Sequence, residues 1–210
     1  MVAPTHASAI YPDLSRTAGD TPIADLTTDS IIIRLHFMIN HLSRWITPIH
    51  DLERLDRAPF RDQPSVKSLM IDIREEERRV FPKMYLISRE TNPDLDRLPI
   101  PEIDARQAAI DAQRSSLSVL AEIRRLRQST CSLLRSLTDA GWNRVGTSRI
   151  EHDWQIRSLA EALVAHDEMM LTLIDIALED YGLRDGVAEH GSARYFELLK
   201  LVPVTTMRTR

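Results

Sequence analysis

Apolar residues recur at spacings of three and four along most of the chain, which is the period of one face of an α-helix. The first stripe predicts a helix from Thr28, with Thr28 or Asp29 as its N-cap because a short side-chain oxygen can accept from free first-turn amides. Pro48 lies in or at the end of this helix and is expected to kink it. The stripe consists of Ile32, Leu35, His36, Ile39, Leu42 and Ile46.

A second amphipathic helix is predicted after Ser65, whose side chain suits an N-cap. Pro82 lies inside this segment and predicts a bend, because proline removes one backbone donor. Three closely spaced prolines between positions 93 and 101 then mark a long loop. The buried stripe of the second helix is expected to be Val66, Leu69, Ile73, Val80 and Met84.

A third helix is predicted from near Glu102 or Ala105 to about Leu137, and Ser115-Ser116 is a candidate break within it. A fourth helix is predicted over about 156–181, with Gly182 as its C-cap. The expected core positions are Leu117, Leu120, Ile123, Leu126, Leu133, Leu134 and Leu137 in the third helix, and Leu159, Leu163, His166, Met170, Leu173 and Ile176 in the fourth.

These four amphipathic segments, with no strand pattern between them, predict an all-α four-helix bundle. Residues 1–27 are rich in Pro, Thr, Ala and Asp without a sustained period, and we expect a mobile N-terminal leader there. A short C-terminal helix is expected at about 193–201. The chain of 210 residues is therefore predicted to hold one bundle domain over 28–210.

The composition of the chain argues against several classes of protein. A formal net charge of −4 argues against a protein that binds nucleic acid, and no apolar run approaches the roughly 18 residues needed to cross a bilayer. The N-terminus lacks the charged and apolar regions of a secretory signal, so a cytoplasmic location is predicted. The single cysteine, Cys131, excludes a disulfide framework and is interpreted as a small buried apolar residue.

Three segments carry a resemblance to a known family. They are the start of the second helix, Ser65-Val-Lys-Ser-Leu-Met-Ile-Asp-Ile-Arg-Glu-Glu-Glu77; the turn Leu137-Thr-Asp-Ala-Gly-Trp-Asn-Arg-Val-Gly-Thr147; and Leu159-Ala-Glu-Ala-Leu-Val-Ala-His-Asp-Glu-Met-Met170. In this order they resemble the motifs of the DinB-like four-helix-bundle family, also called DinB/YfiT-like. The resemblance implies a zinc or nickel ion between one histidine of the second helix and two of the fourth, and thiol-dependent transferase or isomerase activity.

The sequence departs from this pattern at two of the three metal positions. Asp72 stands where the family has its first histidine and Met170 where it has its third, so only His166 matches. Asp72 can still supply an oxygen to zinc, and Glu168 is a further candidate, but a thioether suits copper(I) better than zinc or nickel. The predicted function is a bundle that has lost the metal site, holds no cofactor and serves as a small-molecule-binding or interaction protein. The alternative is a metal-dependent thiol transferase or hydrolase with a non-standard Asp/His site.

Further residues are predicted near this site. Glu77 matches the family's acidic residue; if it points inward it needs a partner, and Arg124, Arg127 and His166 are candidates. His152 precedes the fourth helix and can line the mouth of the bundle. The remaining charges have simpler interpretations: a salt-bridged helix face over 74–79, and a basic solvated face at 124–127. The histidines of the first helix, His36, His41 and His50, share no close face and are expected to be solvated or singly hydrogen-bonded.

A homodimer is also predicted. The family that the motifs resemble frequently dimerises, and the first and third helices carry apolar residues beyond one stripe. If these residues do not complete the core of the monomer, they can form a two-fold interface. They are Ile31, Phe37, Met38, Leu117 and Val119.

Overall fold

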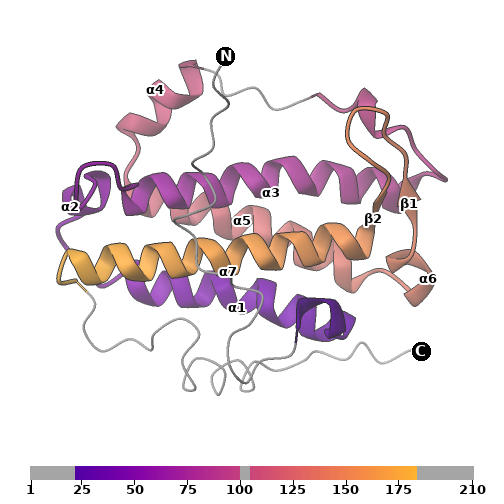
Figure 1. Cartoon of the computed structure of the whole chain (residues 1–210), viewed down its shortest axis with the longest axis horizontal. Coiled ribbons are helices and arrows are strands. Elements are labelled where there is room, and N and C mark those ends of the chain that lie inside the picture. The colour runs from indigo at the N-terminus through magenta and orange to yellow at the C-terminus, as the bar shows by residue number, and fades with distance from the viewer. Residues whose placement is uncertain (1–21, 100–104, 184–210) are drawn as a thin grey trace, which may run out of the picture.

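A computed structural model describes residues 22–99 and 105–183. Four long helices lie side by side and form the body of the molecule (Figure 1): α1 (Thr28–Ile46), α3 (Val66–Arg89), α5 (Ser116–Arg135) and α7 (Ile156–Asp180). α1 and α3 each pack against both α5 and α7. The all-α four-helix bundle is therefore confirmed. No helix within the described residues is both long and apolar enough to cross a membrane.

The long helices run in an up–down–down–up order. Glu77 of α3 contacts both Arg127 and Thr130 of α5, whereas Arg74, one turn earlier, reaches Glu122, so α3 and α5 are parallel. Parallel neighbours require a connection that returns along the full length of the bundle. The segment between α3 and α5 makes this return and passes through η2 (Leu95–Arg97) and α4 (Ala105–Gln113).

The remaining elements are short and lie at the ends of the bundle. The predicted absence of strands was wrong in one place, because an antiparallel pair precedes α7 in which Val145 pairs with Gln155. Strands of two residues are too short to show an alternating pattern in sequence. The elements are η1 (Ile23–Asp25), α2 (Glu53–Asp56), α6 (Asp139–Trp142), β1 (Val145–Gly146) and β2 (Trp154–Gln155).

Short polar side chains set the starts of the helices. Ser65 caps α3 as predicted, and Ser115 caps α5, which confirms the break in the third helical segment. The first N-cap is Thr27, whose hydroxyl accepts from the Ser30 amide, so the prediction of Thr28 or Asp29 was wrong by one or two residues. The predicted helix at 193–201 and residues 1–21 of the predicted leader lie outside the described residues, while Leu26 is buried and its carbonyl accepts from Arg157.

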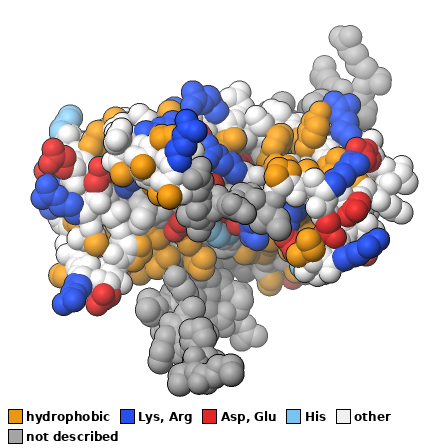
Figure 2. Space-filling view, turned by 90° about the horizontal axis from the view of Figure 1, so that it is seen from above, with side chains coloured by type: hydrophobic (Ala, Val, Ile, Leu, Met, Phe, Trp, Pro, Cys, Tyr) orange, Lys and Arg blue, Asp and Glu red, His pale blue; other side chains and the backbone are white. Residues whose placement is uncertain are grey.

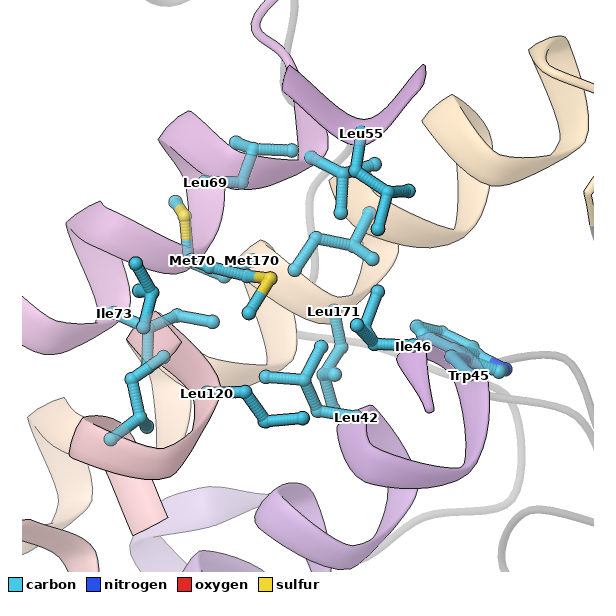
Figure 3. Packing of buried hydrophobic residues seen from close by; sticks show 14 of the residues in the cluster. Leu42, Trp45, Ile46, Leu55, Leu69, Met70, Ile73, Leu120, Met170 and Leu171 are labelled. Carbon is cyan, nitrogen blue, oxygen red and sulfur yellow. The ribbon is translucent and has the colours of Figure 1, made fainter. Parts of the chain in front are cut away.

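The core consists of two apolar clusters, one in each half of the bundle. One cluster gathers residues such as Leu42, Ile73, Leu120 and Met170, and Figure 3 shows part of it. The other lies toward the end of the bundle that carries β1 and β2. Two predicted core positions were wrong: Leu117 is 39% exposed and Ile176 is 45% exposed. Leu117 lies beside the buried face of α5, and Ile176 lies opposite the buried face of α7.

The residues on which the dimer prediction depends lie mostly inside the monomer. Ile31, Phe37, Met38 and Val119 are all buried in the single chain, and Leu117 is the member of the set that stays exposed. They therefore complete the core of one molecule, which was the alternative to an interface. The homodimer remains a prediction.

Candidate functional site

His166 of α7 and Asp72 of α3 are close enough to influence each other electrostatically, and Asp72 is the more exposed of the two. Burial lowers the pKa of His166, while the carboxylates of Glu76 and Asp72 oppose that shift. Burial likewise raises the pKa of Asp72, and the proximity of His166 partly offsets it. Nδ1 of His166 is buried and makes no hydrogen bond to any residue that the structure describes. A metal site formed by Asp72 and His166 remains a prediction.

Met170, the third position of the predicted site, is part of the apolar core. It is 5% exposed and packs into the apolar cluster, where Figure 3 shows it among Met70, Leu171 and neighbouring side chains. Across residues 22–99 and 105–183, no three His, Cys, Asp or Glu side chains are placed to hold a metal ion together. The donors present therefore do not fit a three-histidine zinc or nickel centre, which needs three converging protein ligands.

A charged layer crosses the middle of the bundle between the two apolar clusters, and we call it the central layer. Arg127 donates from Nε to Glu77 Oε2 at 2.8 Å, from Nη2 to Asp167 Oδ1 at 3.0 Å and from Nη1 to the Leu35 carbonyl at 3.1 Å. Nη1 also donates to Asp167 Oδ2, and the Thr130 hydroxyl donates to Glu77 Oε1. The layer therefore joins all four long helices.

The central layer is almost dry. Glu77 is 0%, Arg127 1% and Asp167 3% exposed. Burial raises the pKa of both carboxyl groups, and Arg127 opposes that shift. Burial alone would lower the pKa of Arg127, but the two carboxylates reverse this and raise it. One cation between two carboxylates leaves a net buried charge of −1 when all three are ionised.

The raised pKa values predict a pH dependence of stability. Between the ordinary carboxyl pKa, about 4, and the raised value, the folded chain holds a proton that the unfolded chain has released. The contribution of the layer to the free energy of unfolding is therefore expected to fall as the pH rises above about 4. Denaturation of wild type and Glu77→Gln at several pH values measures it, and an equal slope in both proteins would contradict the assignment.

The layer settles several sequence predictions. Arg127 is the partner of Glu77, as one of the three candidates, whereas Arg124 is exposed and donates to the Ser43 hydroxyl at 2.8 Å. The prediction that 124–127 forms a solvated basic face was wrong for Arg127, because its helical phase points into the core. Asp167 was missed by sequence reasoning. Its signal is its spacing, since it falls four residues after Leu163 and three before Met170, both of which are buried.

The other predicted site residues lie apart from Asp72 and His166. Glu168 faces α1, where its Oε1 accepts from Arg34 Nη1 at 2.6 Å. His152 is exposed before β2, with its ring centroid 3.9 Å from that of Trp154. Three consecutive residues of α7 thus point to three neighbours: His166 to α3, Asp167 into the central layer and Glu168 to α1.

The other titratable groups named in the sequence analysis either form ion pairs or are buried in the core. On α3, Glu76 pairs with Arg79 at 2.7 Å as predicted, but Arg74 is fully buried and binds Asp111 of α4 at 2.5 Å. His41, predicted to be solvated, is buried beside Phe37 and Trp45, and burial lowers its pKa to about 4. Burial raises the pKa of the Cys131 thiol to about 11, which confirms it as an inert buried residue.

Two cavities adjoin α3. One, of about 420 Å³, lies where α3 meets α4 and includes Lys67, Arg74 and Asp111 in its wall. The second, of about 440 Å³, lies between the middle of α3, η2 and the loop before β2. Both volumes fall in the usual range for small-molecule sites, roughly 300–1,000 Å³.

These features define the chain as an all-α four-helix bundle with a charged layer in its core and cavities beside its second long helix. No protein-family model matches the sequence, and no curated protein matches it either. Among solved structures it is similar to YfiT from Bacillus subtilis, described as a probable metal-dependent hydrolase with an unusual four-helix bundle topology. The TM-score is 0.62 at 16% identity, over 78% of this chain and 94% of that one. The likeness shows a shared YfiT-like fold.

Proposed function

We propose that this chain is a bundle protein that binds a small organic molecule and does not use the three-histidine metal centre of the family that its motifs resemble. The identity of Met170 carries the proposal, because a thioether packed among apolar side chains stands where the family that the motifs resemble has its third histidine. Across the described residues no three His, Cys, Asp or Glu side chains converge on one metal position, whereas catalytic zinc sites use three protein ligands.

The two cavities support the binding role. Each combines apolar walls with a few charged side chains, which is the usual composition of a site that orients an organic ligand. The side chains of the central layer, in contrast, are buried against one another, and none of them lines either cavity.

A second candidate function depends on His166. Its buried Nδ1, without a hydrogen bond to a described residue, lies near the carboxylates of Asp72 and Glu76. This favours a metal-dependent thiol transferase or hydrolase with an Asp72/His166 site, and the hydrolase description of YfiT points in the same direction. The two candidate functions differ in one measurable property, the metal content of the protein.

Elemental analysis separates them. Full-length protein produced in medium supplemented with zinc and nickel is expected to carry no stoichiometric metal by inductively coupled plasma mass spectrometry, because its donors do not converge. His166→Ala is then expected to leave the metal content unchanged. His152→Ala is the matched control, since that histidine is exposed. One metal ion per chain that His166→Ala removes and His152→Ala retains would overturn the proposal in favour of the second candidate.

A further inference from the structure

The cavity between α3, η2 and the loop before β2 has a largely apolar interior. Pro82 lies in its wall and Leu95, at its base, is only 4% exposed. At its rim Ile150 is 67% exposed, the largest value among the described large apolar residues. Figure 2 shows apolar and cationic side chains close together toward the end of the molecule that carries β1 and β2. The apolar lining residues are Pro82, Leu95, Leu98, Pro99 and Ile150.

The acidic groups of this cavity are already engaged. Asp96 accepts from the Ser148 hydroxyl at 2.6 Å and from the Arg149 amide at 2.8 Å, and these hydrogen bonds lower its pKa. Glu151 accepts from Lys83 Nζ at 2.6 Å and from Trp154 Nε1 at 2.6 Å, which lowers its pKa as well. Both carboxylates therefore hold the loop in place as anions, and a bound cation would have to displace these donors.

The cationic side chains of this cavity still have hydrogen-bond donors that a ligand can use. Three cations against two carboxylates line the cavity, so its balance is 3 − 2 = +1. Arg79 directs Nε and Nη2 to Glu76, and its Nη1 has no acceptor among the described residues. Lys83 gives hydrogen bonds to a single carboxylate although an ammonium carries three donors. A carboxylate placed between these two side chains would gain charge-assisted hydrogen bonds.

We propose that this cavity binds an amphipathic organic anion with its carboxylate at Arg79 and Lys83. Its hydrocarbon part lies against Leu95, Leu98 and Ile150 and covers the apolar rim. This assignment of ligand class and binding site rests on the proposed small-molecule-binding function.

Isothermal titration calorimetry with decanoate tests the inference on the full-length protein. Decanoate is expected to bind with 1:1 stoichiometry, about tenfold or more tighter than decylammonium, because the cation lacks the charge-assisted contacts. Octanoate is expected to bind up to about 15-fold more weakly than decanoate, since each buried methylene contributes about fourfold in affinity.

Matched variants locate the site. Ile150→Asp and Arg79→Gln are each expected to weaken decanoate binding about tenfold. The controls Ile176→Asp and Arg125→Gln place the same changes on exposed residues of α7 and α5 outside the cavity and are expected to leave binding unchanged. Thermal unfolding of all four variants confirms that they fold.

Three results would overturn the inference: no decanoate binding, equal binding of decylammonium, or an equal loss in the control variants. Metal analysis of the same preparation distinguishes a failure of this ligand site from a failure of the proposed function. Metal-free protein that fails to bind decanoate overturns only the ligand and site assigned here. Stoichiometric metal that His166→Ala removes overturns the proposed function itself.

Discussion

Replacing Arg127 with methionine is expected to lower the free energy of unfolding by about 3–5 kcal/mol, the usual cost of removing one partner from a buried ion pair. The variant leaves two carboxyl groups, Glu77 and Asp167, buried without their cation. They must then either take up protons or remain charged in a nearly dry layer, and both outcomes are unfavourable at neutral pH. Because domains are stable by only about 5–15 kcal/mol, this is a large fraction of the total.

Urea denaturation at neutral pH measures the loss. Arg125→Met is the matched control, because Arg125 is the exposed arginine two residues earlier on the same helix, and it is expected to change stability by less than about 0.5 kcal/mol. Replacing the whole layer with apolar residues, as in Glu77→Leu/Arg127→Met/Asp167→Leu, is expected to recover most of the loss, since no buried charge then remains. A small loss in Arg127→Met would show that the layer is hydrated.

Asp167→Asn is expected to destabilise the protein by about 3 kcal/mol, whereas Glu77→Gln costs less than about 1 kcal/mol. Both oxygens of Asp167 accept from Arg127, so the new amide NH₂ would face a guanidinium N–H. Glu77 has a different neighbour on one oxygen, the Thr130 hydroxyl. A hydroxyl can turn and accept, so the amide in Glu77→Gln keeps two hydrogen bonds: its oxygen accepts from Arg127 and its NH₂ donates to Thr130.

The two variants form their own control, because each replaces one carboxylate of the layer with the isosteric amide. Chemical denaturation of both at neutral pH, in the same buffer, gives the difference directly. Equal losses would contradict the hydrogen-bond assignment around Arg127. A larger loss in Glu77→Gln would show that Glu77 rather than Asp167 is the principal partner of the arginine.

Several features of the fold are local and were predicted from the sequence. The period of the apolar residues located all four long helices, and Ser65 and Ser115 marked two of their starts, because capping depends on residues within one turn. The Asp72/His166 site was predicted only through the resemblance to a family, and it remains a prediction. Helix phase was predicted less accurately: the predicted stripe of the fourth helix included His166, which is half-buried, and omitted Asp167, which is buried.

What only the tertiary structure decided are the relations between residues far apart in the chain. Arg127 lies 50 residues from Glu77 and 40 from Asp167, so the sequence left it both as a candidate partner of Glu77 and as part of a solvated basic face. The cavity beside α3 is assembled from three separate segments, at 78–83, 95–99 and 148–151, which come together because the connection after α3 returns along the bundle. The sequence by itself determined four amphipathic helices and a departure from a three-histidine pattern. Packing decided which charges are buried and where cavities form, because burial depends on neighbours that no local pattern specifies.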